Sequence, residues 1–172
     1  MLFRSYGVAK AASELYLAVF QANYGIRAAA LRYANVYGPR QDPHGEAGVV
    51  AIFCGRLLEG KPCTIYGDGR QTRDYVFVGD VARANLLAAR RSFSGALNIG
   101  TGVETDVIRL HGLLARAAGS AAAPVLAEGR LGEQRRSCID PAAAARALGW
   151  TPEVGIEQGL ARTYQYFKAK RG

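Results

Sequence analysis

The sequence predicts an α/β fold, and three observations support this prediction. Segments with apolar residues at helical spacing alternate with short strand-like segments along the 172 residues. Glycine turns punctuate this alternation, and neither internal repeats nor low-complexity linkers interrupt it. The composition, 49% hydrophobic and 21% charged, is typical of a globular chain that can bury a core.

The first predicted helix runs from about Tyr6 to Tyr24, with Ser5 as its N-cap and Gly25 just past its end. Its apolar stripe consists of Ala12, Leu15, Val19 and Phe20. A buried strand is expected over residues 26–33, followed by a loop over residues 34–44. Since α/β sheets bind ligands in loops that directly follow strands, this loop is a candidate binding segment.

The rest of the chain continues the alternation. In its middle we predict a helix at 49–59, a strand at 63–66, a turn at 67–69, a strand at 75–78, a helix at 80–91 capped by Asp80, and a strand at 96–99. Towards the end we predict a turn at 100–102, a helix capped by Thr105 or Asp106, an extended stretch at 124–126, a basic loop at 130–136, a helix from Asp140-Pro141 to Gly149, and a helix at 155–168.

The charge of the chain indicates what it binds. The net charge is +8, and the pI is about 9.7. The basic residues are spread along the chain rather than interleaved with aromatic residues on one element, which argues against nucleic acid as a partner. Most of them are arginines, which bind phosphate groups through paired hydrogen bonds. The expected partner is therefore a phosphate-bearing small molecule.

Cysteine content and hydropathy exclude several classes of protein. Cys54, Cys63 and Cys138 are odd in number and widely scattered, which fits neither a disulfide framework nor a metal site. No apolar run is long enough to span a bilayer, and no export signal is recognisable. We therefore expect a cytoplasmic protein with reduced thiols, no metal and no membrane association.

Tyr6 and Lys10 are the candidate catalytic residues. Four residues apart in a helix, they project from the same face. A nearby ammonium lowers the pKa of a phenol, and an ionised phenol can act as a general base near neutral pH, unlike free tyrosine with a pKa of about 10. A Tyr-x-x-x-Lys pair is weak support by itself, because both residue types are common on surfaces. Its weight comes from the motifs that follow it.

Four motifs occur in a fixed order: Tyr6-Gly-x-x-Lys10 with Glu14, the run from Leu31 to Arg40, the run from Gly67 to Val78 with Asp80, and Asn98-Ile-Gly-Thr101. Together they resemble the NAD-dependent epimerase/dehydratase family of extended short-chain dehydrogenases/reductases. The stretch from Gln41 to Phe53 is most similar to the UDP-glucose 4-epimerase branch.

The resemblance implies a fold and an assembly. Residues 1–40 would be the last part of a Rossmann-type NAD-binding domain. Residues 41–172 would mainly form a small α/β nucleotide-sugar-binding domain, with some segments returning to the Rossmann sheet. The first helix would be part of a homodimer interface.

The implied activity is NAD-dependent interconversion of UDP-glucose and UDP-galactose, by oxidation and re-reduction at sugar C4. The glycine-rich turn that binds the NAD pyrophosphate is missing from this sequence, and Ser5 stands where the family usually has proline. We therefore expect an N-terminally truncated chain that binds NAD poorly and does not turn over.

The resemblance also implies roles for individual residues. Tyr6 would take the proton from the sugar 4-hydroxyl, Lys10 would assist it and hydrogen-bond the nicotinamide ribose, and Ala34 would line the nicotinamide pocket. The substrate-binding residues would be Asn35, Arg73 and Arg130 at the diphosphate, Val49, Val50, Thr64 and Tyr66 beside the uracil, Glu133 at the ribose, and Ser137 near sugar C2. A small residue at Ser137 leaves room for an N-acetyl group, which predicts that UDP-N-acetylglucosamine is also accepted.

Other interpretations of the sequence stay open. Within the family, these are a nucleotide-sugar 4,6-dehydratase and a UDP-glucuronate decarboxylase; outside it, a non-catalytic nucleotide-sugar-binding module. Asn35 could be a plain loop residue, Arg73 an ion-pair partner of Asp74, and Arg130 merely solvated. We expect packing roles for Tyr33, Tyr37, Tyr75 and Trp150, the last between the C-terminal helices, and structural or exposed positions for His44 and His111.

Overall fold

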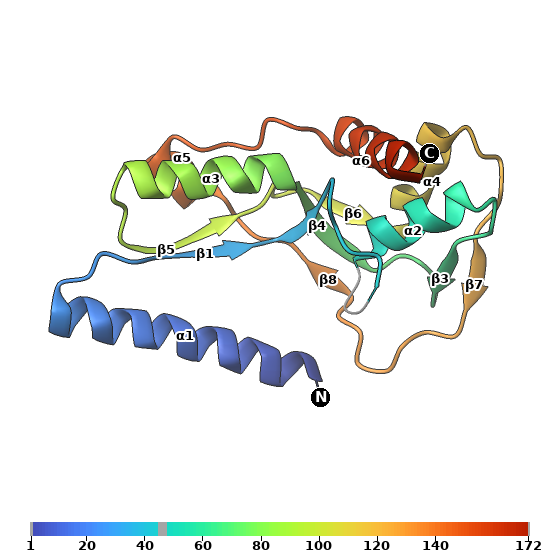
Figure 1. The fold of residues 1–172 in the computed structure, drawn as a ribbon. Coiled ribbons are helices and arrows are strands. Elements are labelled where there is room, and N and C mark those ends of the chain that lie inside the picture. Colours follow the sequence, from blue (N-terminus) through green and yellow to red (C-terminus); the bar gives the residue numbers. More distant parts are fainter. Residues whose placement is uncertain (1, 45–47, 172) are drawn as a thin grey trace.

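A computed structural model describes residues 2–44 and 48–171 and has the α/β architecture expected (Figure 1). Its elements in chain order are α1 (Leu2–Tyr24), β1 (Ala29–Tyr33), β2 (Asn35–Tyr37), α2 (Val49–Leu58), β3 (Thr64–Tyr66), β4 (Thr72–Phe77), α3 (Val78–Arg90), β5 (Gly95–Ile99), β6 (Glu104–Asp106), α4 (Val107–Ala118), β7 (Val125–Ala127), β8 (Arg136–Ser137), α5 (Ala142–Leu148) and α6 (Ile156–Arg171).

The strands form three small sheets. β1 and β5 pair in parallel, and so do β3 and β7. The third sheet is built around β4, which pairs in parallel with β2 and β8 and antiparallel with β6. The parallel partners are far apart in sequence, so the chain crosses over between them, as in α/β folds.

Two hydrophobic clusters form the core. The larger one lies among α2, α4 and α6 and includes Phe53, Leu114 and Leu160. The other lies where α3 and α5 pack on β1 and β5, and includes Trp150. The Trp150 indole donates a hydrogen bond to the Asp80 carbonyl at 2.9 Å, so this side chain joins α5 to α3 rather than the two C-terminal helices to each other.

Helix α1 lies apart from both clusters, on the opposite side of β1 from α3 (Figure 1). None of its side chains from residue 6 to residue 24 is buried. An ion pair between Glu14 and Arg32 ties it to β1. Gln21 adds hydrogen bonds to the Ala28 carbonyl and to the Ser94 hydroxyl. The predicted apolar stripe of this helix is therefore exposed.

The predicted elements appear in the predicted order, but several boundaries were wrong. Helix α1 begins at Leu2, so Ser5 lies within it instead of capping it. Helix α3 begins at Val78, which places Asp80 in its first turn. The Asp80 carboxylate instead accepts hydrogen bonds from the backbone of Glu153 and Val154, so tertiary contacts replaced the expected cap.

The stretch from Ile26 to Tyr33 is a strand only from Ala29 onwards, and it is half-buried at best. The loop expected over residues 34–44 contains β2, and β6 and β8 were not predicted either. Asp106 is the N-cap of α4, where its side chain accepts from the Arg109 amide. In the part of the chain that the structure describes, no helix is both long and apolar enough to cross a membrane.

Candidate functional site

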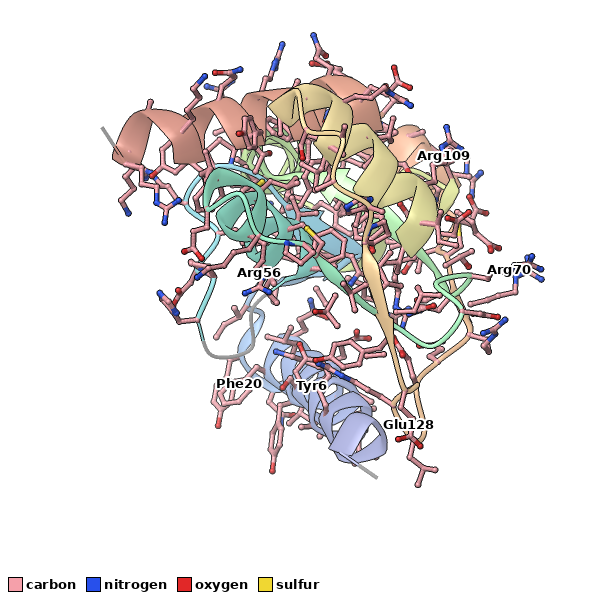
Figure 2. All side chains as sticks on the ribbon, turned by 90° about the vertical axis from the view of Figure 1, so that its right-hand side faces the viewer. Tyr6, Phe20, Arg56, Arg70, Arg109 and Glu128 are labelled. Atoms are coloured by element: carbon pink, nitrogen blue, oxygen red, sulfur yellow. The ribbon has the colours of Figure 1, made fainter. Side chains whose placement is uncertain are left out.

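Tyr6 and Lys10 lie on one face of α1, as their spacing predicts. The Lys10 ammonium lies over the Tyr6 ring, 5.2 Å from its centroid. Tyr6 is 62% exposed, so its phenol is accessible to a ligand as well as to water. Figures 1 and 2 both place the N-terminal end of α1, which carries Tyr6, on the side of the molecule where residues 128–137 run.

The hydroxyl of Tyr6 and the ammonium of Lys10 are suited to the nicotinamide ribose of NAD. Both are hydrogen-bonding groups, and they project together from one helix face. Ala34 lies at the carboxyl end of β1, where its amide donates to the Ile99 carbonyl at 2.9 Å. Its methyl group packs against the hydrophobic cluster that includes Trp150.

Asn35 opens β2 and is exposed, opposite Tyr75 of β4. Asn35 therefore lies at the start of a strand rather than in the loop that was expected. Tyr37 and Tyr75 are buried, which confirms their packing roles, and burial raises the pKa of the Tyr75 phenol to about 12. Tyr33 was wrongly expected to pack: it is 45% exposed, and its hydroxyl donates to Asn85.

Arg73 of β4 and Ser137 of β8 come together with Glu133, which lies just before β8. Arg73 pairs in register with Ser137 across these two parallel strands. Its guanidinium donates to the Thr72 carbonyl at 2.8 Å and to the Gln134 carbonyl at 2.7 Å. It also faces the Glu133 carboxylate at 3.6 Å, with the Arg73 side chain 18% exposed. A half-buried cation is thus held at a fixed place beside an acid and a small hydroxyl.

The suggested ion pair between Arg73 and Asp74 is wrong. Asp74 points the other way and is buried, because successive side chains of a strand point to opposite faces. Its carboxylate accepts from the Thr101 amide at 2.9 Å, from the Thr101 hydroxyl at 2.6 Å and from the Gly102 amide at 3.1 Å. Asp74 therefore anchors the glycine turn between β5 and β6.

Tyr66 and Arg130 form a second pair beside this cluster. The Arg130 guanidinium lies over the Tyr66 ring, 4.1 Å from its centroid. Thr64 and Tyr66 alternate with the buried Ile65 on β3, so both are turned away from the core. The side chain of Arg130 is thus engaged with an aromatic ring, although the residue is exposed.

Val49 and Val50 begin α2. Val50 is 1% exposed and belongs to the larger core cluster, and Val49 packs against that cluster. Only the backbone of this first helical turn is therefore suited to a base. Gly48 precedes the helix without a side-chain cap, and residues 45–47 of the same predicted motif lie outside the described residues.

The basic loop after β7 is held to the rest of the chain by ion pairs, which its composition alone does not indicate. We call residues 128–137 the strap, because ion pairs tie it across the ends of β3, β4 and β6. Arg135 pairs with Asp68 at 2.8 Å, and Arg136 pairs with Glu104 at 2.6 Å. Hydrogen bonds from these arginines lower the pKa of each acid to about 2. The acids and the arginines of these pairs are far apart in the sequence, so no local signal pointed to the contacts.

Two cavities lie elsewhere in the described part of the chain. One of about 430 Å³ is lined by β1 and α3, and one of about 520 Å³ lies among residues 40–44, α2 and α6. No predicted site residue lines either cavity. The structure places Thr64 and Tyr66 on β3, Arg73 on β4, and Arg130, Glu133 and Ser137 in the strap, whereas Asn35 lies on β2 and Val49 and Val50 lie on α2.

A family model, that of the NAD dependent epimerase/dehydratase family, matches residues 3–100. A UDP-glucose 4-epimerase of Mycolicibacterium smegmatis is 46% identical over 166 residues, which are 96% of this chain and 53% of that protein. A dTDP-glucose 4,6-dehydratase of Actinoplanes sp. is 33% identical over 168 residues, 96% of this chain and 52% of that protein.

The fold is also similar to solved structures. The UDP-glucose 4-epimerase of Thermotoga maritima, solved with UDP-glucose, superposes with a TM-score of 0.92 at 49% identity. The match covers 97% of this chain and 54% of the solved one. The chain thus spans about half the length of the relatives that it matches.

Proposed function

Because the chain belongs to the NAD-dependent epimerase/dehydratase family, we propose that it carries the catalytic pair and the substrate-binding residues of a UDP-sugar 4-epimerase that interconverts UDP-glucose and UDP-galactose. The observation that carries this proposal is the cluster of Arg73, Glu133 and Ser137. Arg73 is about sixty positions from Glu133 and Ser137 in the sequence, yet the pairing of β4 with β8 brings it beside them. The similarity to UDP-glucose 4-epimerases supports it.

The diphosphate of the substrate would bind Arg73 and Arg130, with Asn35 as a further donor. Arg73 is only partly exposed, so a charge-assisted hydrogen bond to phosphate would be weakly screened by solvent. The Glu133 carboxylate, which faces Arg73 at 3.6 Å, would accept hydrogen bonds from the ribose hydroxyls. The uracil would lie along Thr64 and Tyr66, with the backbone of Val49 and Val50 on its other side.

The sugar would be processed by Tyr6 and Lys10. The Tyr6 phenolate would accept the proton of the sugar 4-hydroxyl and later return it. The Lys10 ammonium, 5.2 Å from the ring centroid, would hydrogen-bond the nicotinamide ribose. NAD, when bound, supplies the acceptor and donor of the C4 hydride. Ser137, with its small side chain, would leave room for an N-acetyl group at sugar C2.

We further propose that residues 1–40 belong to the NAD-binding domain and that most of residues 41–172 form the substrate domain. The two hydrophobic clusters support this division. The cluster on β1 and β5 includes α3 and α5, which would be the segments that return to the Rossmann sheet. The exposed apolar residues of α1 support a homodimer through this helix.

Calorimetric titration of the chain with UDP-glucose, and separately with dTDP-glucose, tests the proposal. We expect saturable binding that favours the UDP-sugar, and a loss of at least about tenfold in affinity for Arg73→Ala, since a charge-assisted hydrogen bond contributes about 1.5–3 kcal/mol. His44→Ala, at an exposed position beyond β2, is the control and should bind like the wild type. A folded chain that binds neither sugar nucleotide would refute the proposal.

A nucleotide-sugar 4,6-dehydratase is the second candidate, favoured by the similarity to the dehydratase of Actinoplanes sp.. The same titration separates the two candidates. Tighter binding of dTDP-glucose than of UDP-glucose would support the dehydratase, because the two ligands differ in the base and in the ribose 2′-hydroxyl that Glu133 would contact.

A further inference from the structure

Arg130 differs from the neighbouring arginines in what it contacts. In the strap, Arg135 pairs with Asp68 and Arg136 pairs with Glu104. On β4, Arg73 faces Glu133. Among the residues that the structure describes, the Arg130 guanidinium forms no ion pair or hydrogen bond. Its one specific contact is with the Tyr66 ring, at 4.1 Å from the centroid. Its positive charge is therefore not neutralised by a carboxylate.

The backbone brings these two side chains together. β3 and β7 pair in parallel up to Tyr66 and Ala127, and the next amide, of Gly67, donates to the Ala127 carbonyl at 2.9 Å. Beyond this bond the two chains cross closely at glycines: a Cβ atom on Gly129 would lie 3.5 Å from the Gly67 Cα. Arg130 therefore starts from a fixed point beside Tyr66, although its own side chain is exposed.

Stacking and phosphate binding use different parts of a guanidinium. The cation–π contact uses the flat face of the group, whereas its five N–H donors point outward in the plane. An arginine held by its face over a ring keeps its edge available for a phosphate. Arg135 instead uses two N–H groups of its edge on both carboxylate oxygens of Asp68, which leaves it fewer donors for a phosphate.

We propose that Tyr66 is a positioning residue, whose ring holds the Arg130 guanidinium with its N–H edge directed to the diphosphate of the sugar nucleotide. This inference rests on the proposed function, because it takes UDP-sugar as the ligand of this surface. It gives the Tyr66 side chain a role towards Arg130 that is separate from the contact of β3 with the base.

Titrations of UDP into four variants test the inference. We expect Tyr66→Leu to weaken binding about two- to fivefold, the range of an exposed cation–π contact. Tyr66→Phe should bind within about twofold of the wild type, because it keeps the ring. Arg130→Ala should lose about tenfold or more, as expected for a charged hydrogen bond. Adding Tyr66→Leu to Arg130→Ala should cause no further loss, because the ring then has no guanidinium to hold.

Arg109→Gln, on α4, is the matched control for the general effect of removing one positive charge (Figure 2). It should leave the UDP affinity within about twofold of the wild type. NMR of the free chain gives a readout that needs no ligand. The Arg130 side-chain protons should show an upfield ring-current shift that Tyr66→Phe keeps and Tyr66→Leu removes.

The outcomes distinguish a failure of the proposed function from a failure of the role proposed for Tyr66. If the wild-type chain does not bind UDP, the proposed function fails, and this inference fails with it. If the wild type binds but Tyr66→Leu binds equally well, the inference alone is overturned. It is also overturned if Tyr66→Leu weakens binding by the same factor with and without Arg130, because the ring would then act on the base directly.

Discussion

At the scale of single residues, Asp74 is a buried carboxylate next to the candidate site, held by several hydrogen bonds. It is 1% exposed, and its carboxylate accepts hydrogen bonds from three groups of the turn after β5. Gly100 makes room for it, since a Cβ atom there would lie 2.4 Å from an Asp74 carboxylate oxygen. Asp74 thereby holds β4 in place. Its neighbour Arg73 projects from the opposite face of the same strand.

Replacing Asp74 by alanine should lower the free energy of unfolding by about 3 kcal/mol or more, because three donors lose their buried acceptor. Asp74→Asn should lose less, because it keeps one acceptor oxygen. Urea denaturation measures both. Asp140→Ala is the control: this exposed carboxylate accepts one backbone hydrogen bond, from Ala142, and its loss should cost about 1 kcal/mol. Equal effects at the two positions would contradict the anchoring role.

His111 links stability to pH. It is 6% exposed, its Nε2 has no hydrogen-bond partner among the described residues, and its ring packs edge-on against Phe53. Burial lowers the pKa of His111, so the folded state favours the neutral imidazole more than the unfolded state does. Below the ordinary histidine pKa of about 6.5, the unfolded state gains a proton that the folded state does not, and stability falls.

The free energy of unfolding should therefore decrease between about pH 7 and about pH 5, and His111→Phe should remove much of this decrease. Asp68 and Glu104, whose pKa values lie at about 2, do not titrate in this window. The measurement is urea denaturation at several pH values. His44→Gln, at an exposed position, should keep the wild-type slope; a similar slope in His111→Phe would show that other groups are responsible.

Residue types and their spacing in the sequence predicted which side chains share a face of a helix. They did not predict which charged groups pair with each other. The pairing of Tyr6 with Lys10 followed from helical spacing, and the structure has it. The partner of Arg73 could not be predicted in this way. It was sought in the adjacent Asp74, whereas the facing acid is Glu133, sixty positions away, brought there by the pairing of β4 with β8.

At the scale of elements, the helices were predicted better than the strands. Helices α4 and α6 have long apolar repeats and clear end signals, and both lie close to where they were expected. Strands β2, β6 and β8 have three residues or fewer and no apolar alternation of their own. Each exists because β4 offers it hydrogen bonds, and this long-range cause leaves no local signal.

The packing of α6 can be tested at a single glycine. A Cβ atom on Gly159 would lie 2.0 Å from the hydroxyl oxygen of Tyr37, a buried ring that packs against Tyr75 and Phe77. Gly159→Ala should therefore destabilise the protein by about 1–3 kcal/mol despite the higher helix propensity of alanine. Thermal unfolding measures the change.

Gly112 in α4 is the matched control, because a Cβ atom there would meet nothing within 4 Å. Gly112→Ala should stabilise the protein by about 0.5–1 kcal/mol, through helix propensity alone. The same sign of effect for both alanine variants would mean that α6 does not pack on Tyr37 as described.

At the scale of the whole molecule, α1 leaves the largest set of exposed apolar side chains. Leu15 is 70% exposed, Val19 52% and Phe20 46%. Monomeric proteins rarely expose such a continuous apolar face, which supports the proposed dimer. The spacing of these residues predicts the stripe itself, but spacing cannot tell whether the stripe faces the core of the same chain or a second chain.

We predict that the chain self-associates and that Val19→Glu weakens this association at least about tenfold, because a charge would then be buried without a partner. Sedimentation equilibrium over a range of concentrations measures the effect. Leu131→Glu is the control. Leu131 is a fully exposed apolar residue in the strap, outside α1, and its replacement should leave association unchanged. A chain that is monomeric throughout, or a Val19→Glu variant that associates normally, would refute an interface through α1.

The two tethers of α1, the Glu14–Arg32 ion pair and the Gln21 hydrogen bonds, also affect how the molecule responds to warming. An element with no buried side chain from residue 6 to residue 24 opens locally at a lower free energy than β4, so its amides should exchange with deuterium first. Tyr6 and Lys10 lie on this early-opening helix, whereas Arg73 lies on the strand at the centre of a sheet. Nucleotide affinity should therefore persist at temperatures at which the arrangement of Tyr6 and Lys10 on α1 is already lost.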